Sequence, residues 1–184
     1  MLYFLGPSPE DEGGPETKRS KGAPSPNVVW EWEGDGGKWT AYSSDHSKAL
    51  TDALSQGEKD VTLQVAPSVK MKIRFESMSQ ENVATGWQRS IRCVSTSSSS
   101  PSNSEAVWEW ENEKGTWMAY SPKVQRLLTA CQLCGVDSAK VEGTARKRYT
   151  VDLKAMKQRG QRGGQEMEVR RRHAAGEWVL VVCM

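Results

Sequence analysis

The sequence predicts an α+β protein of two tandem modules, each a curved antiparallel sheet packed on one α-helix. One observation is an internal repeat, because the Trp-Glu-Trp-Glu motif of residues 30–33 recurs at residues 108–111, an offset of 78. A second is that the spacing of hydrophobic residues changes from the period of a strand to that of a helix, and back again, once in each copy. A period of 78 residues is too long for a solenoid unit and suits a small domain, so we infer a tandem duplication.

The same offset relates further positions without a gap. Six of the eight Trp residues lie at matching positions, which random recurrence would hardly produce. The matched pairs include Trp30 and Trp108, Gly37 and Gly115, Trp39 and Trp117, Tyr42 and Tyr120, Met78 and Met156, Gln80 and Gln158, and Arg92 and Arg170.

The first copy opens with a predicted hairpin. Apolar and acidic residues alternate from Val28, which places Trp30 and Trp32 on one face of a strand. Residues 34–37 contain three glycines and favour a turn, because glycine adopts the positive φ angles of tight turns. The returning strand carries Trp39.

An amphipathic helix follows in each copy. In the first, residues 43–45 supply helix caps and Gly57 suits the exit. In the second, Ser121 is the predicted N-cap, Pro122 the first helical residue and Gly135 the stop. The predicted buried stripes are Ala49, Leu50, Ala53 and Leu54 in the first helix and Val124, Leu127, Leu128 and Cys131 in the second.

At least three short strands are expected after each helix. They are predicted at residues 61–65, 69–75 and 87–94 in the first copy and at 139–142, 146–153 and 166–172 in the second.

The repeat boundaries and composition give a domain plan. It comprises a disordered arm (1–26), a first module (27–94), a Ser-rich linker (95–104), a second module (105–172) and a C-terminal extension (173–184) that could add an edge strand. A flexible linker of this length spans roughly 17 Å, so the modules must lie side by side.

The repeated motif resembles the WWE domain family. In each copy, Trp-x-Trp-Glu precedes a Gly-containing turn, Trp-x-x-Tyr, a helix, a strand leading into Met-x-Gln, and an Arg-containing strand. The resemblance covers residues 27–94 and 105–172, and the tandem pair is similar to the N-terminal region of Deltex-type E3 ubiquitin ligases. It implies a half-barrel of about six strands closed by a helix.

Charge and cysteine content limit the function classes. The net charge is +2, but residues 140–172 carry eleven basic and four acidic side chains, so an anionic partner is expected there. Four cysteines without a secretory signal fit an intracellular protein of the cytoplasm or nucleus. Cys131 and Cys134 lie in the predicted helix without a second Cys pair, so we interpret them as buried thiols, not metal ligands. No catalytic motif or cofactor loop is present, and we expect a non-enzymatic protein without a cofactor.

The resemblance implies recognition of the iso-ADP-ribose unit of poly(ADP-ribose), linking ADP-ribosylation to ubiquitination. The family's contacts are aromatic residues of the first hairpin, a Tyr after the helix, a Gln nine residues later and an Arg on the next strand. The implied ligand-binding residues are Trp110, Trp117, Tyr149 and Gln158, with Arg170 as a supporting cation, in the second copy, and Trp32, Trp39, Gln80 and Arg89 in the first.

Each copy departs from the family pattern once. Met71 replaces the Tyr in the first copy, and Met167 replaces the Arg in the second. A Met side chain donates no hydrogen bond to a phosphate, whereas an Arg donates two. Candidates to compensate in the second copy are Lys157, Arg162 and Arg170. We therefore expect the second copy to be the binder, with a cleft joining Arg89 to Tyr149 as an alternative.

Several of these residues also have a structural interpretation. We expect Trp30 and Trp108 in the core, whereas the other hairpin tryptophans are either core or pocket wall. Gln80 and Gln158 either contact ligand or satisfy a backbone group. The rival function is a protein-interaction module without ADP-ribose binding, with a ubiquitin-ligase component or a receptor tail as partner. Single-stranded RNA is disfavoured because the tryptophans alternate in core-forming strands, and no membrane partner is expected.

Overall fold

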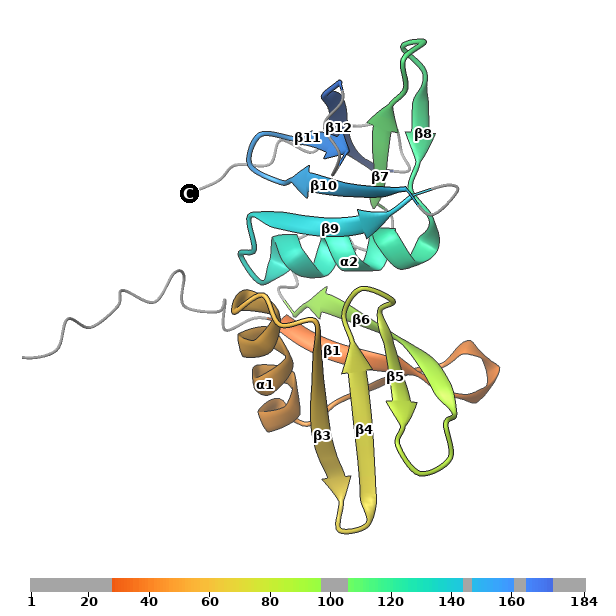
Figure 1. The fold of residues 1–184 in the computed structure, drawn as a ribbon. Helices are drawn as coiled ribbons and strands as arrows, with labels where there is room; N and C mark the ends of the chain where they lie inside the picture. The colour runs from red at the N-terminus through yellow and green to blue at the C-terminus, as the bar shows by residue number, and fades with distance from the viewer. Residues whose placement is uncertain (1–27, 97–105, 144–146, 161–164, 174–184) are drawn as a thin grey trace, which may run out of the picture.

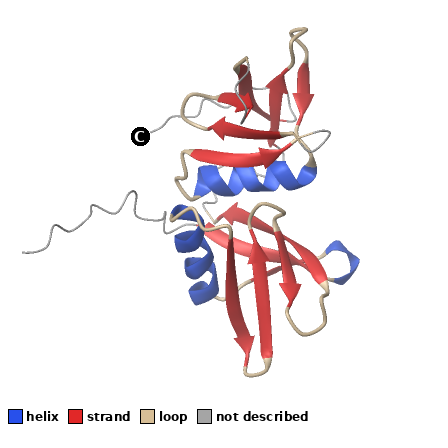
Figure 2. Cartoon of the chain, in the orientation of Figure 1, coloured by secondary structure: helices blue, strands red, loops and turns tan. Residues whose placement is uncertain are grey.

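The structure, a computed structural model, describes residues 28–96, 106–143, 147–160 and 165–173 (Figure 1). It contains two six-stranded antiparallel sheets and one long helix beside each (Figure 2). The strand orders are β2-β1-β6-β5-β4-β3 and β8-β7-β12-β11-β10-β9, so the two modules share one topology. The predicted α+β class, tandem arrangement and half-barrel sheets are confirmed.

The first module follows the predicted order of elements. Its elements are β1 (Val28–Glu33), the 3-10 turn η1 (Asp35–Gly37), β2 (Trp39–Ala41), α1 (Ser44–Ser55), β3 (Asp60–Ala66), β4 (Val69–Arg74), β5 (Ser79–Asn82) and β6 (Gln88–Ser95). Helix α1 is capped as predicted, because the Ser43 side chain accepts a hydrogen bond from the His46 backbone N–H at 3.2 Å.

The second module repeats this order. Its elements are β7 (Ala106–Glu111), β8 (Trp117–Ala119), α2 (Pro122–Leu133), β9 (Ser138–Glu142), β10 (Arg148–Asp152), β11 (Lys157–Gly160) and β12 (Met167–His173). Ser121 is the N-cap residue and Pro122 the first residue of the helix, although the Ser121 side chain makes no capping hydrogen bond. The predicted stripe of α2 is buried.

Strands β5 and β11 have no counterpart among the strands delimited from the sequence. Each is four residues long and mostly polar, so neither shows the alternation that identifies a strand. The residue before each strand, Met78 or Met156, has a positive φ of 48° or 53°. The positive φ closes a tight turn at the same place in both modules and sets Gln80 and Gln158 on the inner face of the sheet.

Each core is organised around one tryptophan. Trp30 and Trp108 are almost fully buried, and their indole N–H groups donate to Thr51 and Thr129 of the adjacent helices, both at 3.1 Å. The prediction that these two tryptophans belong to the core is confirmed. The bond ties β1 to α1 and β7 to α2, which closes each half-barrel.

The modules lie side by side, as the linker length predicted. Helix α2 packs against β9 and β7 of its own module and also against β6 of the first (Figure 1). Near the end of this helix, the Ser55 hydroxyl donates to the Cys134 carbonyl at 3.4 Å. The strands extend one residue past the expected module ends, to Ser95 and His173. The arm, most of the linker and residues 174–184 lie outside the described residues.

Candidate functional site

The second module contains a cavity of about 580 Å³ between the first turn of α2 and the sheet. Its wall brings together three of the residues expected to bind ligand, Trp110, Tyr149 and Gln158. Tyr120, Lys123 and Lys147 also line it. The N-terminus of α2 contributes a positive partial charge, and Lys123 lies in that first turn, 3.1 Å from Glu142. The Glu142 carboxylate also lines the cavity and pairs with Lys123, which leaves Lys147 as the ammonium group without an ion pair among the described residues. An aromatic wall beside these groups suits a ligand that contains a ring and carries negative charge.

Gln158 is held by the core of the module. It is only 3% exposed, and its Oε1 accepts a hydrogen bond from the Tyr120 hydroxyl at 2.9 Å. Burial raises the pKa of Tyr120, so its hydroxyl stays protonated and remains the donor. The Gln158 Nε2 then donates to the Met167 sulfur at 3.3 Å. Sulfur is a weak hydrogen-bond acceptor, so a ligand with a stronger acceptor can replace Met167 as the partner of the Gln158 amide.

The Tyr149 ring occupies space that a glycine leaves open. A Cβ atom on Gly143 would lie 2.7 Å from Cε2 of Tyr149, so any side chain at this position would require the Tyr149 ring to move. The repeat offset matches Gly143 with Val65 and Tyr149 with Met71. The first module therefore differs from the second at both of these neighbouring positions. Because Gly143 and Tyr149 lie in contact, we treat the differences at these two positions as linked.

The equivalent corner of the first module is built differently. Gln80 is again buried and again accepts from a tyrosine hydroxyl, that of Tyr42, at 2.6 Å. Arg89 donates to the Glu33 carbonyl at 3.3 Å and to Asp35 Oδ1 at 2.9 Å. A cavity of about 330 Å³ lies here, lined by Met71, Gln80, Asn82, Thr85, Trp87 and Arg89.

Trp32 lies beside this corner, because the Arg89 guanidinium sits over its ring, 5.6 Å from the centroid. Trp32 and Trp110 are both half-buried and pack against the core. Trp110 also lines the cavity of its module. The two interpretations of these tryptophans, core and pocket wall, therefore both apply to Trp110.

Three of the expected ligand-binding residues lie on the other face of the sheets. Arg170 pairs with Glu109 at 2.6 Å and stacks over the Trp117 ring, with 4.0 Å to its centroid. Glu109 faces away from the cavity, because it alternates with the inward Trp108 and Trp110. Trp117 and Arg170 are therefore not brought together with Gln158.

Trp39 repeats this arrangement in the first module. The Arg92 guanidinium lies 4.3 Å from the centroid of the Trp39 ring, and Arg92 Nε lies 2.7 Å from Glu31 Oε2. This repeated stack gives a structural reason for the acidic residues of the Trp-Glu-Trp-Glu motif. A role of Trp39, Trp117 or Arg170 in ligand binding stays a prediction.

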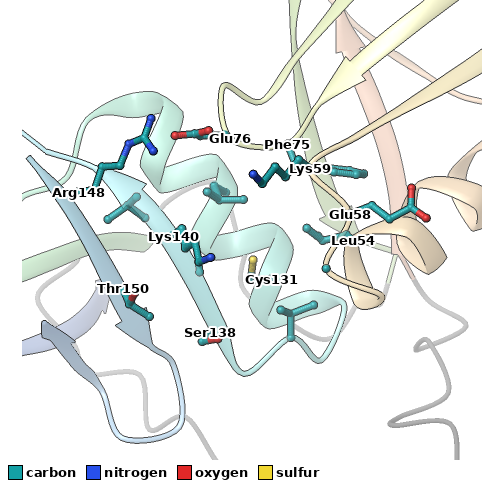
Figure 3. A pocket seen from close by; sticks show the side chains of 15 residues that line it. Leu54, Glu58, Lys59, Phe75, Glu76, Cys131, Ser138, Lys140, Arg148 and Thr150 are labelled. Atoms are coloured by element: carbon teal, nitrogen blue, oxygen red, sulfur yellow. The ribbon is translucent and has the colours of Figure 1, made fainter. Parts of the chain in front are cut away.

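Arg89 and Tyr149 line separate cavities, each built only from residues of its own module. A cleft that joins these two residues stays a prediction. A groove of about 500 Å³ does lie between the modules, and Figure 3 shows it. Its first-module wall is the end of α1 and the turn after β4, and its second-module wall is α2, β9 and β10. Its lining includes Leu54, Glu58, Phe75, Leu127, Lys140 and Arg148.

Three cysteines of the described residues lie where β6 of the first module meets α2 of the second. Cys93, Cys131 and Cys134 are buried free thiols. The interpretation of Cys131 and Cys134 as buried thiols is confirmed. Within the described residues, no group of three or more His, Cys, Asp or Glu side chains could hold a metal ion. None of the helices in those residues is long and apolar enough to cross a membrane.

Several cavity residues were missed from the sequence. Tyr120 belongs to the repeat, which could have flagged it, but its partner Gln158 lies 38 positions away. Lys123 and Lys147 carry no local pattern, and Gly143 resembles an ordinary loop glycine. Arg162, expected as a compensating cation, lies outside the described residues.

Two half-barrels of one topology, each with a buried Gln fixed by a Tyr, define a tandem of small homologous domains. The WWE domain family matches residues 28–93 and 106–171, and the chain belongs to this family.

Similar curated proteins include three ubiquitin ligases. The chain is 32% identical over 111 residues to the E3 ubiquitin-protein ligase DTX1 of Xenopus laevis, covering 57% of the chain and 17% of that protein. It is 35% identical over 105 residues to the E3 ubiquitin-protein ligase DTX4 of Mus musculus, covering 53% of the chain and 17% of that protein. It is 31% identical over 99 residues to the E3 ubiquitin-protein ligase DTX1 of Homo sapiens, covering 50% of the chain and 16% of that protein. The chain thus spans a small part of each relative.

Proposed function

We propose that the second module binds iso-ADP-ribose units of poly(ADP-ribose) and that the chain acts as a non-catalytic reader of ADP-ribosylation. The observation that carries this proposal is the cavity in which Trp110, Tyr149 and Gln158 converge beside two lysines. Its volume of about 580 Å³ lies within the usual range for small-molecule sites.

The groups in the cavity match the parts of this ligand. The Tyr149 and Trp110 rings offer stacking surfaces for adenine, and the Gln158 amide can hydrogen-bond to its edge. Lys123, Lys147 and the N-terminus of α2 supply positive charge for the diphosphate, which the missing Arg does not provide. The ligand would displace the weak contact between Gln158 and Met167.

The experiment is a calorimetric titration of iso-ADP-ribose into the whole chain and into two matched variants, Gln158→Ala and Gln80→Ala. We expect Gln158→Ala to weaken binding by about tenfold or more, because a buried hydrogen bond to the ring is lost. Gln80→Ala should leave this affinity within about twofold. Absence of binding by the wild-type chain would refute the proposal.

A further variant tests the coupled Gly and Tyr positions. Gly143→Val reproduces the first module's residue and would push the Tyr149 ring out of its place. We expect this single change to abolish iso-ADP-ribose binding while circular dichroism stays that of the folded protein, because Gly143 is exposed and outside the core. Tight binding by the variant would contradict the assigned role of Tyr149.

The groove between the modules favours a second candidate function, a protein-interaction module of a ubiquitin-ligase pathway. It is lined by the buried apolar side chains of Leu54, Phe75 and Leu127 and by the exposed side chains of Lys140 and Arg148. The relatives are named as E3 ubiquitin-protein ligases, which suggests the pathway. A ubiquitin-ligase component or receptor tail that uses this groove should bind Arg148→Glu more weakly than the wild-type chain. The control Lys114→Glu, on the distant β7–β8 turn, should bind normally, and equal binding by both variants would rule out the groove.

A further inference from the structure

We propose that residues 177–182 of this chain form a further β-strand, which pairs with the open edge of β9 inside the groove between the modules. These residues lie outside the described part of the chain, whereas the edge and the groove that would receive them lie within it. The groove shares only Val141 with the second-module cavity, so the pairing does not depend on iso-ADP-ribose binding.

Strand β9 has an open edge. It is the outermost strand of its sheet, and within the described residues it pairs with β10 alone. The Gly143 N–H donates to the Lys147 carbonyl at 2.8 Å, which makes these two residues a hydrogen-bonded pair. Such pairs alternate along an antiparallel ladder, so every second residue of β9 directs its N–H and C=O away from β10. The residues that do so are Ser138, Lys140 and Glu142.

The matching edge of the first module is closed. Strand β3 is also the outermost strand of its sheet, but the carbonyl of Gln64, the counterpart of Glu142, is hydrogen-bonded to the His46 ring at 3.2 Å. The register of β3 also shifts between Gln64 and Ala66. A bulge and local hydrogen bonds of this kind oppose the addition of another strand. Only the second module therefore offers a regular edge for pairing.

The open edge faces an apolar groove. Residues 138–141 of β9 line the groove of about 500 Å³, together with side chains of α2 and of the first module (Figure 3). Helix α2 contributes Leu127 and Cys131, and the first module contributes Leu54 and Phe75. All four side chains are buried or nearly so. A strand that lies along β9 would therefore be covered by apolar side chains from both modules.

Residues 177–182 have the composition that this environment requires. They read Glu-Trp-Val-Leu-Val-Val, with five consecutive apolar residues after the Glu. A short apolar run without alternation is typical of a strand that is covered on both faces. The repeat offset matches this run with residues 99–104 of the Ser-rich linker. The module with the open edge is thus followed by an apolar run, and the module with the closed edge is not.

The connection is long enough to reach the groove. Strand β12 ends at His173, and Arg171 near this end donates to the side chain of Gln132 in the last turn of α2. Cys131 lines the groove at the same end of this helix. Between His173 and Glu177 an extended chain spans up to about 13 Å, whereas a helix has a diameter of about 10 Å. The chain can therefore pass around the end of α2.

A seated segment would exclude a protein partner from the groove. The chain would then regulate its own interaction surface, and displacement of the segment would open it. This consequence rests on the second proposed function, whereas the pairing itself does not.

The test is amide hydrogen exchange of the whole ¹⁵N-labelled chain, followed by NMR at Lys140. The Lys140 N–H points to the open edge, so it is protected only when a strand pairs there. We expect it to exchange at least about tenfold more slowly in the wild-type chain than in Leu180→Pro, because a proline inside the segment disrupts strand pairing. The Val141 N–H, which bonds to β10, should stay protected in both chains and shows that β9 remains folded.

The matched control is Ala174→Pro, which introduces the same residue into the connection before the segment. Lys140 should exchange in this variant as it does in the wild-type chain, and its protection should be independent of protein concentration. Rapid exchange of Lys140 in the wild-type chain would overturn the proposal, and so would protection that Leu180→Pro leaves unchanged. Protection that is lost on dilution would instead assign the strand to a second copy. None of these readouts uses iso-ADP-ribose or a protein partner, so their failure is distinct from failure of either proposed function.

Discussion

The hydrogen bond between Trp30 and Thr51 links β1 to α1 in the first half-barrel. Removing it measures how much this link contributes to the free energy of unfolding. The Thr51 side chain accepts from the Trp30 indole at 3.1 Å and donates to the Ser47 carbonyl at 2.9 Å. Thr51→Val keeps the shape of the side chain and removes both hydrogen bonds.

The cost follows from burial. Trp30 and Thr51 are 0% and 2% exposed, so the indole N–H would remain without an acceptor and without water. A buried unsatisfied donor costs about 1–3 kcal/mol, and we expect Thr51→Val to lower the free energy of unfolding by about 2 kcal/mol. Thr129, the equivalent partner of Trp108, is only half-buried, so Thr129→Val should cost about 1 kcal/mol.

Urea unfolding followed by circular dichroism measures both values, provided that the slope with denaturant is unchanged between variants. The control is Thr62→Val, the same chemical change on an exposed position of β3, which should alter stability by less than about 0.5 kcal/mol. Equal stability of Thr51→Val and Thr62→Val would refute the reasoning, because the buried bond would then contribute nothing net.

Two further predictions concern titratable groups outside the cavities. Burial tends to raise the pKa of Glu109, but hydrogen bonds from two β12 arginines outweigh this and lower it below 4.5. Because the folded-state pKa is lowered, the stabilisation is present above the unfolded-state value and is lost as pH falls through the folded one. Wild-type stability should therefore decrease more steeply below about pH 4.5 than that of Glu109→Gln in urea titrations at several pH values; parallel curves would contradict this. The thiols of Cys93, Cys131 and Cys134 should react with DTNB only upon unfolding, since all are buried and burial raises the pKa of Cys131 to about 12; rapid native labelling of these residues by peptide mass analysis would contradict their burial.

The sequence alone was sufficient for the fold class and for most elements of each module. An offset constant over both copies identified the duplication, and periods of two and 3.6 residues located the first hairpin and the helix of each module. These signals can be recognised in the sequence without knowledge of contacts in space. Strands β5 and β11 were not predicted because four mostly polar residues show no alternation, and these strands form by pairing with their neighbours.

Only the tertiary structure decided how the candidate ligand residues are grouped. Trp110 and Trp117 belong to one hairpin, but strand alternation turns them to opposite faces, where Arg170 stacks on Trp117. The space that Gly143 leaves for Tyr149 depends on a contact across two strands. Helix α2 packs on both modules because the fold brings β6 to it, which no spacing in the sequence indicates. Local patterns fix elements, whereas sites arise where side chains distant in sequence meet, and that is set by packing.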